Sequence, residues 1–294
     1  FGEGIIQVTN QSADYNYTLS AQLKRRFGEA LHLTAAYTYM QSKDVQSLTS
    51  DRAISNWRNG RVYAGLEDDL DDATTSYFER PHRIIAYGSY SLPWKTTQIS
   101  AFYEGMSGTP FTYTVVGDLN GDGNNGNDPM YIPRDATDVT EMRIGTVVGG
   151  VFAPNPAEAQ LVEDFIASHD CLDDQRGQIM ERNSCRSPWQ NRLDVALRQD
   201  IPTIRGQRLS LRLDIVNFLN FLNKDWGQIR LPSVNQNFPQ QPILRQNSRT
   251  VGSLNQQYVN YTFENVPKTS GAFRKDQQNQ ANFYRMQLTL KYSF

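Results

Sequence analysis

Long apolar runs are missing from this sequence. No segment approaches the roughly 18 consecutive apolar residues that a transmembrane helix needs, and the mean hydropathy is −0.59. An excess of one charge is missing too, because 29 basic and 31 acidic residues leave a net charge of −2. A chain without a basic excess has little with which to neutralise nucleic-acid phosphates. The sequence therefore excludes a helical membrane protein and argues against nucleic acid as the main partner.

Signs of catalysis are equally scarce. The chain has two cysteines and three histidines, and it contains no G-x-S-x-G, no H-E-x-x-H and no glycine-rich phosphate loop. The acidic run at 67–72 is typical of a solvated loop, with cation binding as the alternative. No pair of carboxylates stands out as a glycosidase pair. We therefore predict that the protein is not an enzyme.

What the sequence does have is strict alternation. In residues 284–294 every even position is apolar or aromatic and every odd position is polar, which is typical of a strand with one apolar and one polar face. The pattern recurs at about 14–27, 31–40, 83–92, 97–105, 189–201 and 207–218. A tilted membrane strand needs about 9–11 residues, whereas a globular strand has about 5–6. Tyrosine, with 15 copies, suits the interfaces of a membrane.

The connections between these segments alternate in length. Short turns lie at 28–30, 93–95 and 202–206, and long segments at 41–82, 106–188 and 219–283. Outer-membrane barrels have short periplasmic turns and long extracellular loops, whereas compact soluble domains rarely carry structureless connections beyond about 15 residues. The sequence therefore predicts an all-β fold, an antiparallel transmembrane β-barrel that is partial, with about seven long strands of a larger barrel. Residues 1–294 would form its carboxy-terminal part, and 106–188 a long extracellular insertion.

Charged residues occupy the face opposite the Leu, Val and Ile positions. In a soluble sandwich this would be the solvent face, and in a barrel it would line the lumen; strand length and loop asymmetry favour the barrel. The candidate lumen-facing residues are Arg192, Asp194, Arg198, Arg208, Arg212 and Asp214.

One loop of the insertion is similar to a calcium site. Asp118, Asn120 and Asp122, followed by glycine, match the first half of the loop D-x-[DN]-x-[DN]-G. The second half departs from it, because Pro129 stands where a bidentate glutamate is required, although Asp128 could contribute. The alternative is a turn rich in Gly, Asn and Asp. No cofactor is required on either interpretation, and calcium would be structural.

Two further features lie in the same insertion. Cys171 and Cys185 are the only cysteines, and outside a reducing compartment they most simply form a disulfide. Such a loop closure is worth about 3 kcal/mol in the chain-entropy model. The alternatives are two free thiols or a metal site, for which only His169 lies near. Asn155 and Pro156 fit the cap and first position of a short helix that ends near residue 166.

Six stretches carry a family resemblance when taken in order. They are YNYTLSAQLKRRF with the following LHLTAAYTYMQSK, RPH at 80–82, GDLNGDGNNGNDPMYIP at 117–133, SPWQNRLD at 187–194, LDIVNFLNFL at 213–222 and the terminal LTLKYSF. Together they resemble the carboxy-terminal third of a TonB-dependent outer-membrane receptor. More narrowly, they resemble the Oar-like group, whose members carry a carboxypeptidase-regulatory-like domain before the plug.

The resemblance implies a barrel of 22 strands with a plugged lumen, in the outer membrane of a Gram-negative cell and among its lipids. Import of a large or scarce ligand would be driven by TonB, ExbB and ExbD. The barrel assembly machinery would recognise the aromatic end, with Leu290, Tyr292 and Phe294 as its candidate signal. The chain begins at Phe1 without a signal peptide, plug or TonB box. We therefore expect a fragment or a processed product, whose contact with TonB depends on the missing plug.

Two other functions fit the same residues. The long, cross-linked loops are compatible with a surface adhesin or a structural outer-membrane barrel. A secreted, calcium-stabilised β-rich hydrolase or lectin is the third alternative. The sequence does not identify the ligand.

Overall fold

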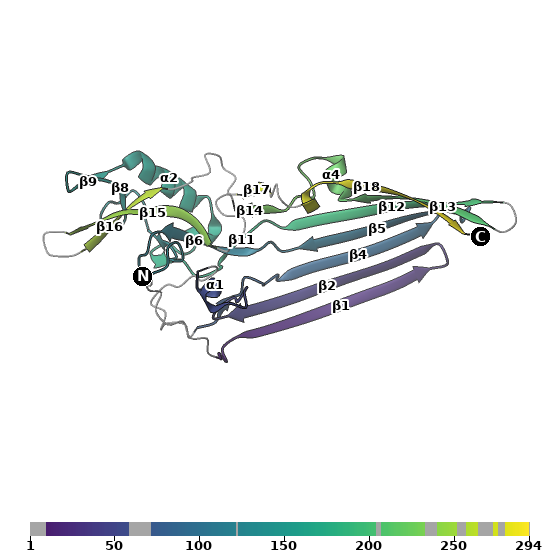
Figure 1. Ribbon diagram of the computed structural model, residues 1–294, viewed down its shortest axis with the longest axis horizontal. Helices are drawn as coiled ribbons and strands as arrows, with labels where there is room; N and C mark the ends of the chain where they lie inside the picture. Colours follow the sequence, from purple (N-terminus) through teal and green to yellow (C-terminus); the bar gives the residue numbers. More distant parts are fainter. Residues whose placement is uncertain are drawn as a thin grey trace.

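The computed structural model describes residues 10–58, 72–121, 123–203, 207–232, 240–251, 257–263, 273–275 and 280–293. Two regions lie end to end along the long axis of the molecule (Figure 1). One is a sheet of long antiparallel strands, called here the long sheet. The other, called the cap, is formed by residues 107–188 with strands from 240–251 and 257–263. Among the described residues, no helix is long and apolar enough to cross a membrane.

The long sheet contains the seven predicted strands. They are β1 (Tyr15–Phe27), β2 (Leu31–Asp44), β4 (His82–Ser91), β5 (Thr97–Met106), β12 (Gln190–Pro202), β13 (Arg208–Val216) and β18 (Arg285–Ser293). Their order in the sheet is their order in the chain, every neighbouring pair is antiparallel, and the two-residue β3 (Thr74–Thr75) pairs beside β2. β1 and β18 are the two edges, so the barrel is not closed. The predicted fold, a partial antiparallel barrel, is confirmed.

The short turns lie at one end of the long sheet and the cap at the other (Figure 1). Gly28 joins β1 to β2 with φ +59°, and Lys95 lies in the next short turn with φ 60°. Such left-handed conformations suit tight connections between antiparallel strands. The predicted strand at 207–218 ends earlier, at Val216, because Asn217 is left-handed (φ 54°) and begins a helical turn.

Alternation gives the long sheet two different faces. In one row of paired residues Leu23, Ala35, Ala86, Tyr103 and Leu193 lie side by side across five strands. Side chains two positions apart share a face, so this apolar row repeats along the strands. The result is a continuous apolar face, with the polar residues of every strand on the other.

The cap is built around a six-stranded sheet with the order β11-β6-β15-β16-β8-β9. β15 pairs with β6 in parallel, as β16 does with β8. The elements of the cap are β6 (Pro110–Val116), β7 (Tyr131–Ile132), β8 (Arg143–Val148), β9 (Val151–Pro154), α2 (Pro156–Ala167), α3 (Asp170–Asp173), β10 (Gln178–Ile179), β11 (Cys185–Arg186), β15 (Gln240–Val251) and β16 (Gln257–Phe263). The remaining elements are α1 (Ala53–Arg58), α4 (Phe218–Leu222), β14 (Arg230–Pro232), β17 (Phe273–Lys275) and the 3-10 helix η3 (Gln280–Asn282).

The buried apolar core of the described residues lies in the cap and not in the long sheet. Phe111, Tyr113 and Val115 of β6 are at most 2% exposed. They belong to one cluster with Val162 and Phe165 of α2. The predicted helix is confirmed: the Asn155 side chain accepts the Glu158 N–H, and Pro156 takes the first turn. The segments that connect the long strands therefore form a packed unit of their own.

Candidate functional site: a charged strand face and an anchored cap

Arginine–aspartate pairs dominate the polar face of the long sheet. The pairs are Arg192–Asp194 at 2.8 Å, Arg198–Asp200 at 2.9 Å and Arg212–Asp214 at 2.7 Å. In each pair the two residues are two positions apart on one strand, so both side chains point to the same face. Arg198 lies directly opposite Arg212 across β12 and β13, where like charges would destabilise the pairing. The aspartate on the same strand balances the charge of each of these two arginines and so reduces the repulsion between them.

Further bonds join these pairs to neighbouring strands. The Asp200 carboxylate also accepts the Ser210 hydroxyl at 2.7 Å, and the Asp194 carboxylate accepts the Asn217 N–H at 2.8 Å. Arg83 of β4 pairs with Glu104 of β5 at 2.5 Å. These four ion pairs thus form a network whose own charges balance, fixed by bonds within and between strands. Five further basic residues on the same face add positive charge: Lys24, Arg26, Arg208, Arg285 and Lys291.

All six candidate lumen residues share this face of β12 and β13, since they alternate with the apolar positions. The sequence analysis did not single out Asp200, Arg83 or Glu104. Asp200 follows Arg198 at the spacing of the two predicted pairs, and this spacing was the signal that would have found it. That the face lines a lumen stays a prediction.

Aromatic residues lie at both ends of the apolar face. At the cap end these are Tyr15, Tyr17, Tyr37, Tyr39, Tyr103, Trp189 and Tyr284; at the short-turn end they are Phe27, Tyr90, Trp94 and Tyr292. Between them the face is aliphatic and exposed, with Leu19 72% and Leu290 67% exposed. An apolar band between two aromatic girdles is the expected exterior of a membrane barrel.

Two ion pairs fasten the cap to the rim of the long sheet. Arg182 pairs with Asp44 at the end of β2 at 2.7 Å, and their side chains are 7% and 14% exposed. Arg186 pairs with Glu79 at 2.7 Å. The Arg182 guanidinium also donates to the Thr74 hydroxyl at 2.7 Å. Because the charges are largely withdrawn from water, these contacts fix the position of the segment around β11.

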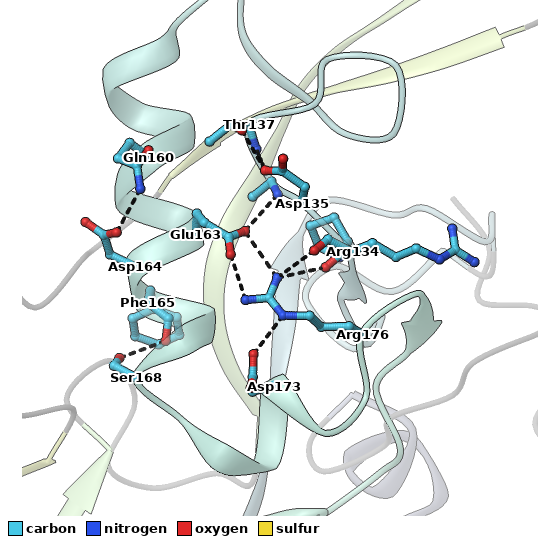
Figure 2. Close-up of polar contacts among 12 residues, drawn as sticks. Arg134, Asp135, Thr137, Gln160, Glu163, Asp164, Phe165, Ser168, Asp173 and Arg176 are labelled. Carbon is cyan, nitrogen blue, oxygen red and sulfur yellow. Dashed lines mark hydrogen bonds and ion pairs between the residues drawn. The ribbon is translucent and has the colours of Figure 1, made fainter.

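Arg176 holds the interior of the cap together (Figure 2). Its guanidinium bonds to Glu163 of α2 at 2.7 Å, to Asp173 of α3 at 2.7 Å and to the Arg134 carbonyl at 3.0 Å. Glu163 in turn accepts the Ala136 N–H at 2.9 Å. The hydrogen bonds that Arg176 donates to Glu163 and then to Asp173 raise the pKa of its guanidinium. Charge-assisted bonds of this kind are stronger than neutral ones, so they hold α2, α3 and the segment after β7 together.

Comparison with known protein families identifies the class of protein to which the chain belongs. A family model described as "Outer membrane beta barrel domain" matches residues 2–260. The chain belongs to this outer-membrane β-barrel family. No curated protein and no solved structure matches the chain. Membership places the protein in the outer membrane of a Gram-negative cell, with the apolar face against lipid.

As an outer-membrane barrel protein, the chain lies in a compartment that permits disulfides. The predicted disulfide Cys171–Cys185 is confirmed, and it joins α3 to β11. The Gln175 side chain bridges the enclosed loop, since its amide donates to the Cys171 carbonyl at 2.5 Å and to the Ser184 hydroxyl at 3.0 Å. Among the described residues no group of three potential metal ligands occurs, so nothing supports the alternative of a metal at these cysteines.

In the loop predicted to bind calcium, the candidate ligands Asp118 and Asp128 already accept hydrogen bonds from the backbone. The two Asp118 carboxylate oxygens accept the N–H groups of Gly121 at 2.7 Å and Gly123 at 3.1 Å. Asp128, 4% exposed, accepts the Leu119 N–H at 2.9 Å. Such bonds are typical of the turn interpretation. Asp122 lies outside the described residues, as do 67–71 of the acidic run and Phe294. Calcium stays a prediction.

The candidate assembly signal lies at the short-turn end of the long sheet. Leu290 and Tyr292 are exposed on the apolar face of β18, and the Tyr292 hydroxyl donates to the Gln207 side chain. This placement leaves both side chains accessible from the lipid side. Their recognition by an assembly factor stays a prediction.

Proposed function

We propose that the chain is part of a TonB-dependent outer-membrane receptor of the Oar-like type, which takes up a large or scarce ligand by energy-coupled import. The observation that carries this proposal is the anchored cap. A packed unit, cross-linked by Cys171–Cys185, is fixed by Arg182–Asp44 and Arg186–Glu79 to one end of a strand wall that has one charged face. A rigid surface placed ahead of a polar path suits capture followed by transport.

The charged face supports a role as the wall of that path. Outer-membrane barrels alternate apolar residues towards lipid with polar residues towards the lumen. Arg192, Arg198 and Arg212 each have an aspartate two residues away. Such a wall offers many hydrogen-bonding groups, and a carboxylate balances the charge of each of these three arginines. At these three positions a polar ligand would therefore meet paired charges and not isolated ones.

The partners follow from the same proposal. TonB would act through a plug domain, the barrel assembly machinery would insert the strands, and outer-membrane lipid would cover the apolar face. No cofactor is needed, and a calcium ion at 118–128 would only fix its loop.

The experiment compares three strains of the source bacterium: a deletion of the gene for the full-length protein, a tonB deletion and the double deletion. Each is grown on a panel of single nutrient sources. We expect the gene deletion to lose growth on one source that the tonB deletion also loses, with no further loss in the double deletion. A gene deletion that impairs surface attachment independently of tonB, with all nutrient sources still used, would instead establish the adhesin or structural alternative.

A further inference from the structure

A hollow of about 500 Å³ opens on the apolar face near the cap end of β5 and β12. The side chains used below are Tyr103, Trp189, Asn191, Asp225, Trp226 and Arg230. Tyr103 lies in the same row as Ala86 and Ala35, and Asn191 lies opposite Gly105. The hollow therefore belongs to the lipid-facing side of the wall and not to the charged side.

The floor of the hollow is preorganised by one asparagine. The Tyr103 hydroxyl donates to the Asn191 side-chain oxygen at 2.7 Å, and the Trp189 indole N–H donates to the same oxygen at 3.0 Å. Both rings thus have their polar groups satisfied. Gly105 leaves the space that they need, since a Cβ there would lie 2.5 Å from the Tyr103 hydroxyl and 3.0 Å from the Trp189 ring.

The roof is a loop between α4 and β14, and it is fixed by buried asparagines. Asn217, 1% exposed, donates to the carbonyls of Gly227 and Ala281, both at 2.8 Å. Asn220, 7% exposed, donates to the Lys224 carbonyl at 2.9 Å and to the Trp226 carbonyl at 3.2 Å. Both asparagines belong to the stretch LDIVNFLNFL, and their hydrogen bonds give this stretch a structural role. It builds a rigid roof and presents Trp226, 53% exposed, at its edge.

The chemistry of the hollow selects a class of ligand. Two indoles and a phenol offer faces on which the C–H groups of a sugar ring can stack, because the faces of aromatic rings are negative. Arg230 is exposed and has no carboxylate partner among the described residues, which leaves its guanidinium able to bind a phosphate with two bonds. The amide of Asn191 and the carboxylate of Asp225 are placed for hydroxyl or amino groups.

The location selects the source of that ligand. Aromatic girdles mark the level of lipid head groups, and the hollow lies at the girdle of the cap end, beside the long connections. In outer-membrane barrels long connections face outward, so the hollow meets the outer leaflet. We propose that it binds the phosphorylated sugar head group of an outer-leaflet glycolipid, with Arg230 on the phosphate and Trp189 and Trp226 against the sugar. The acyl chains would continue along the apolar face.

The test uses the full-length protein purified in detergent from the source outer membrane. Glycolipid retained after extensive washing is measured by native mass spectrometry. Variants Arg230→Gln and Trp226→Ala are compared with Trp94→Ala, which removes an exposed tryptophan at the opposite end of the same face. We expect Arg230→Gln to retain roughly tenfold less glycolipid, as loss of one charged hydrogen bond implies. Trp226→Ala should also retain less, because one stacking face is lost, while Trp94→Ala retains the wild-type amount. Heat-modifiable migration on a gel checks that each variant is folded.

Two outcomes would overturn the proposal. One is equal retention by the wild type and both hollow variants, which would mean that lipid binds elsewhere. The other is displacement of bound glycolipid by the phosphorylated sugar without acyl chains at equal concentration, which would assign the hollow to a soluble ligand. Retention that falls in folded hollow variants and resists the soluble sugar supports a lipid site.

Discussion

Arg182 and Asp44 lie 138 positions apart in the chain and form an ion pair of 2.7 Å at the junction of the cap and the long sheet. The guanidinium also donates to the Asp44 backbone carbonyl. One side chain thus binds both the carboxylate and the main chain at the end of β2. The contact ties the cap to the first hairpin of the sheet.

Loss of this pair should loosen the cap. Arg182→Ala leaves Asp44 without its charged partner at a site where both side chains are nearly buried, and breaking such a pair costs about 3–5 kcal/mol. We expect faster proteolysis within 107–188 in the folded protein. The control is Lys95→Gln, which breaks the ion pair with Glu29, both exposed; pairs of that kind contribute about 0–1 kcal/mol. Equal protease sensitivity of the two variants would contradict the anchoring role.

The disulfide should stabilise the cap independently of the long sheet. Replacing Cys171 and Cys185 together by serine removes a loop closure of 14 residues, worth about 3 kcal/mol. We expect a lower melting temperature for the cap, measured by the near-ultraviolet circular dichroism of its aromatic core. Heat-modifiable migration, which reports the barrel, should not change. Loss of both signals together would show that the cap and the sheet unfold as one unit.

The roof loop over β12 should depend on Asn217 more than on its exposed neighbours. Asn217→Ala deletes two buried hydrogen bonds and places alanine at φ 54°, and each lost buried bond costs about 1–3 kcal/mol. Asn223→Ala is the matched control, because Asn223 is exposed and accepts one bond, from the Asp225 N–H. We expect Trp226 fluorescence to shift towards that of a solvated indole only in the first variant. A shift of the same size in both variants would contradict this role.

Alkaline pH should unfold the cap. Burial raises the pKa of Tyr261 from 10.0 to about 12, and burial also raises the pKa of Tyr113. The folded state therefore holds these protons more tightly. Their contribution to stability is full below pH 10 and is lost as the pH rises towards 12. Tyrosinate absorbance, followed with protease sensitivity, measures the transition.

Phenylalanine at these two positions isolates the cause. The Tyr113 hydroxyl is buried without a hydrogen-bond partner in the described structure, so Tyr113→Phe should be neutral or stabilising at neutral pH. With Tyr261→Phe it should move the alkaline transition to higher pH. An unchanged transition in the double variant would assign it to other groups.

The seven strands and their order could be predicted because two simple signals agree. Alternation with a period of two identifies each strand, and short turns join β1 to β2, β4 to β5 and β12 to β13 as hairpins. The pairs across the long connections follow from the up-and-down order of strands in a membrane barrel. The direction of Arg192, Arg198 and Arg212 follows from the same period. Their aspartate partners could have been predicted as well, because a strand residue shares its face with the residue two positions later.

The cap could not be predicted in the same way. β6, with the sequence PFTYTVV, is buried on both faces and alternates only from Phe111 to Val115, a run shorter than the roughly 9–11 residues of a membrane strand. Its partner β15 runs parallel to it and comes from residues 240–251, more than a hundred positions later. No local pattern encodes such a contact. The left-handed Asn217 was likewise visible only as part of a family motif, because one of its two carbonyl partners, Ala281, lies 64 positions away in the chain.

The pairing of each arginine with an aspartate on the same strand has a consequence for biogenesis. A charge whose partner lies on a neighbouring strand is unbalanced until that neighbour arrives. Three pairs are balanced within one strand, before any neighbour arrives: Arg192–Asp194, Arg198–Asp200 and Arg212–Asp214. These three pairs can therefore enter the membrane already neutralised, before the next strand arrives. The same independence means that a neighbouring strand can be exchanged during evolution while these three pairs stay matched.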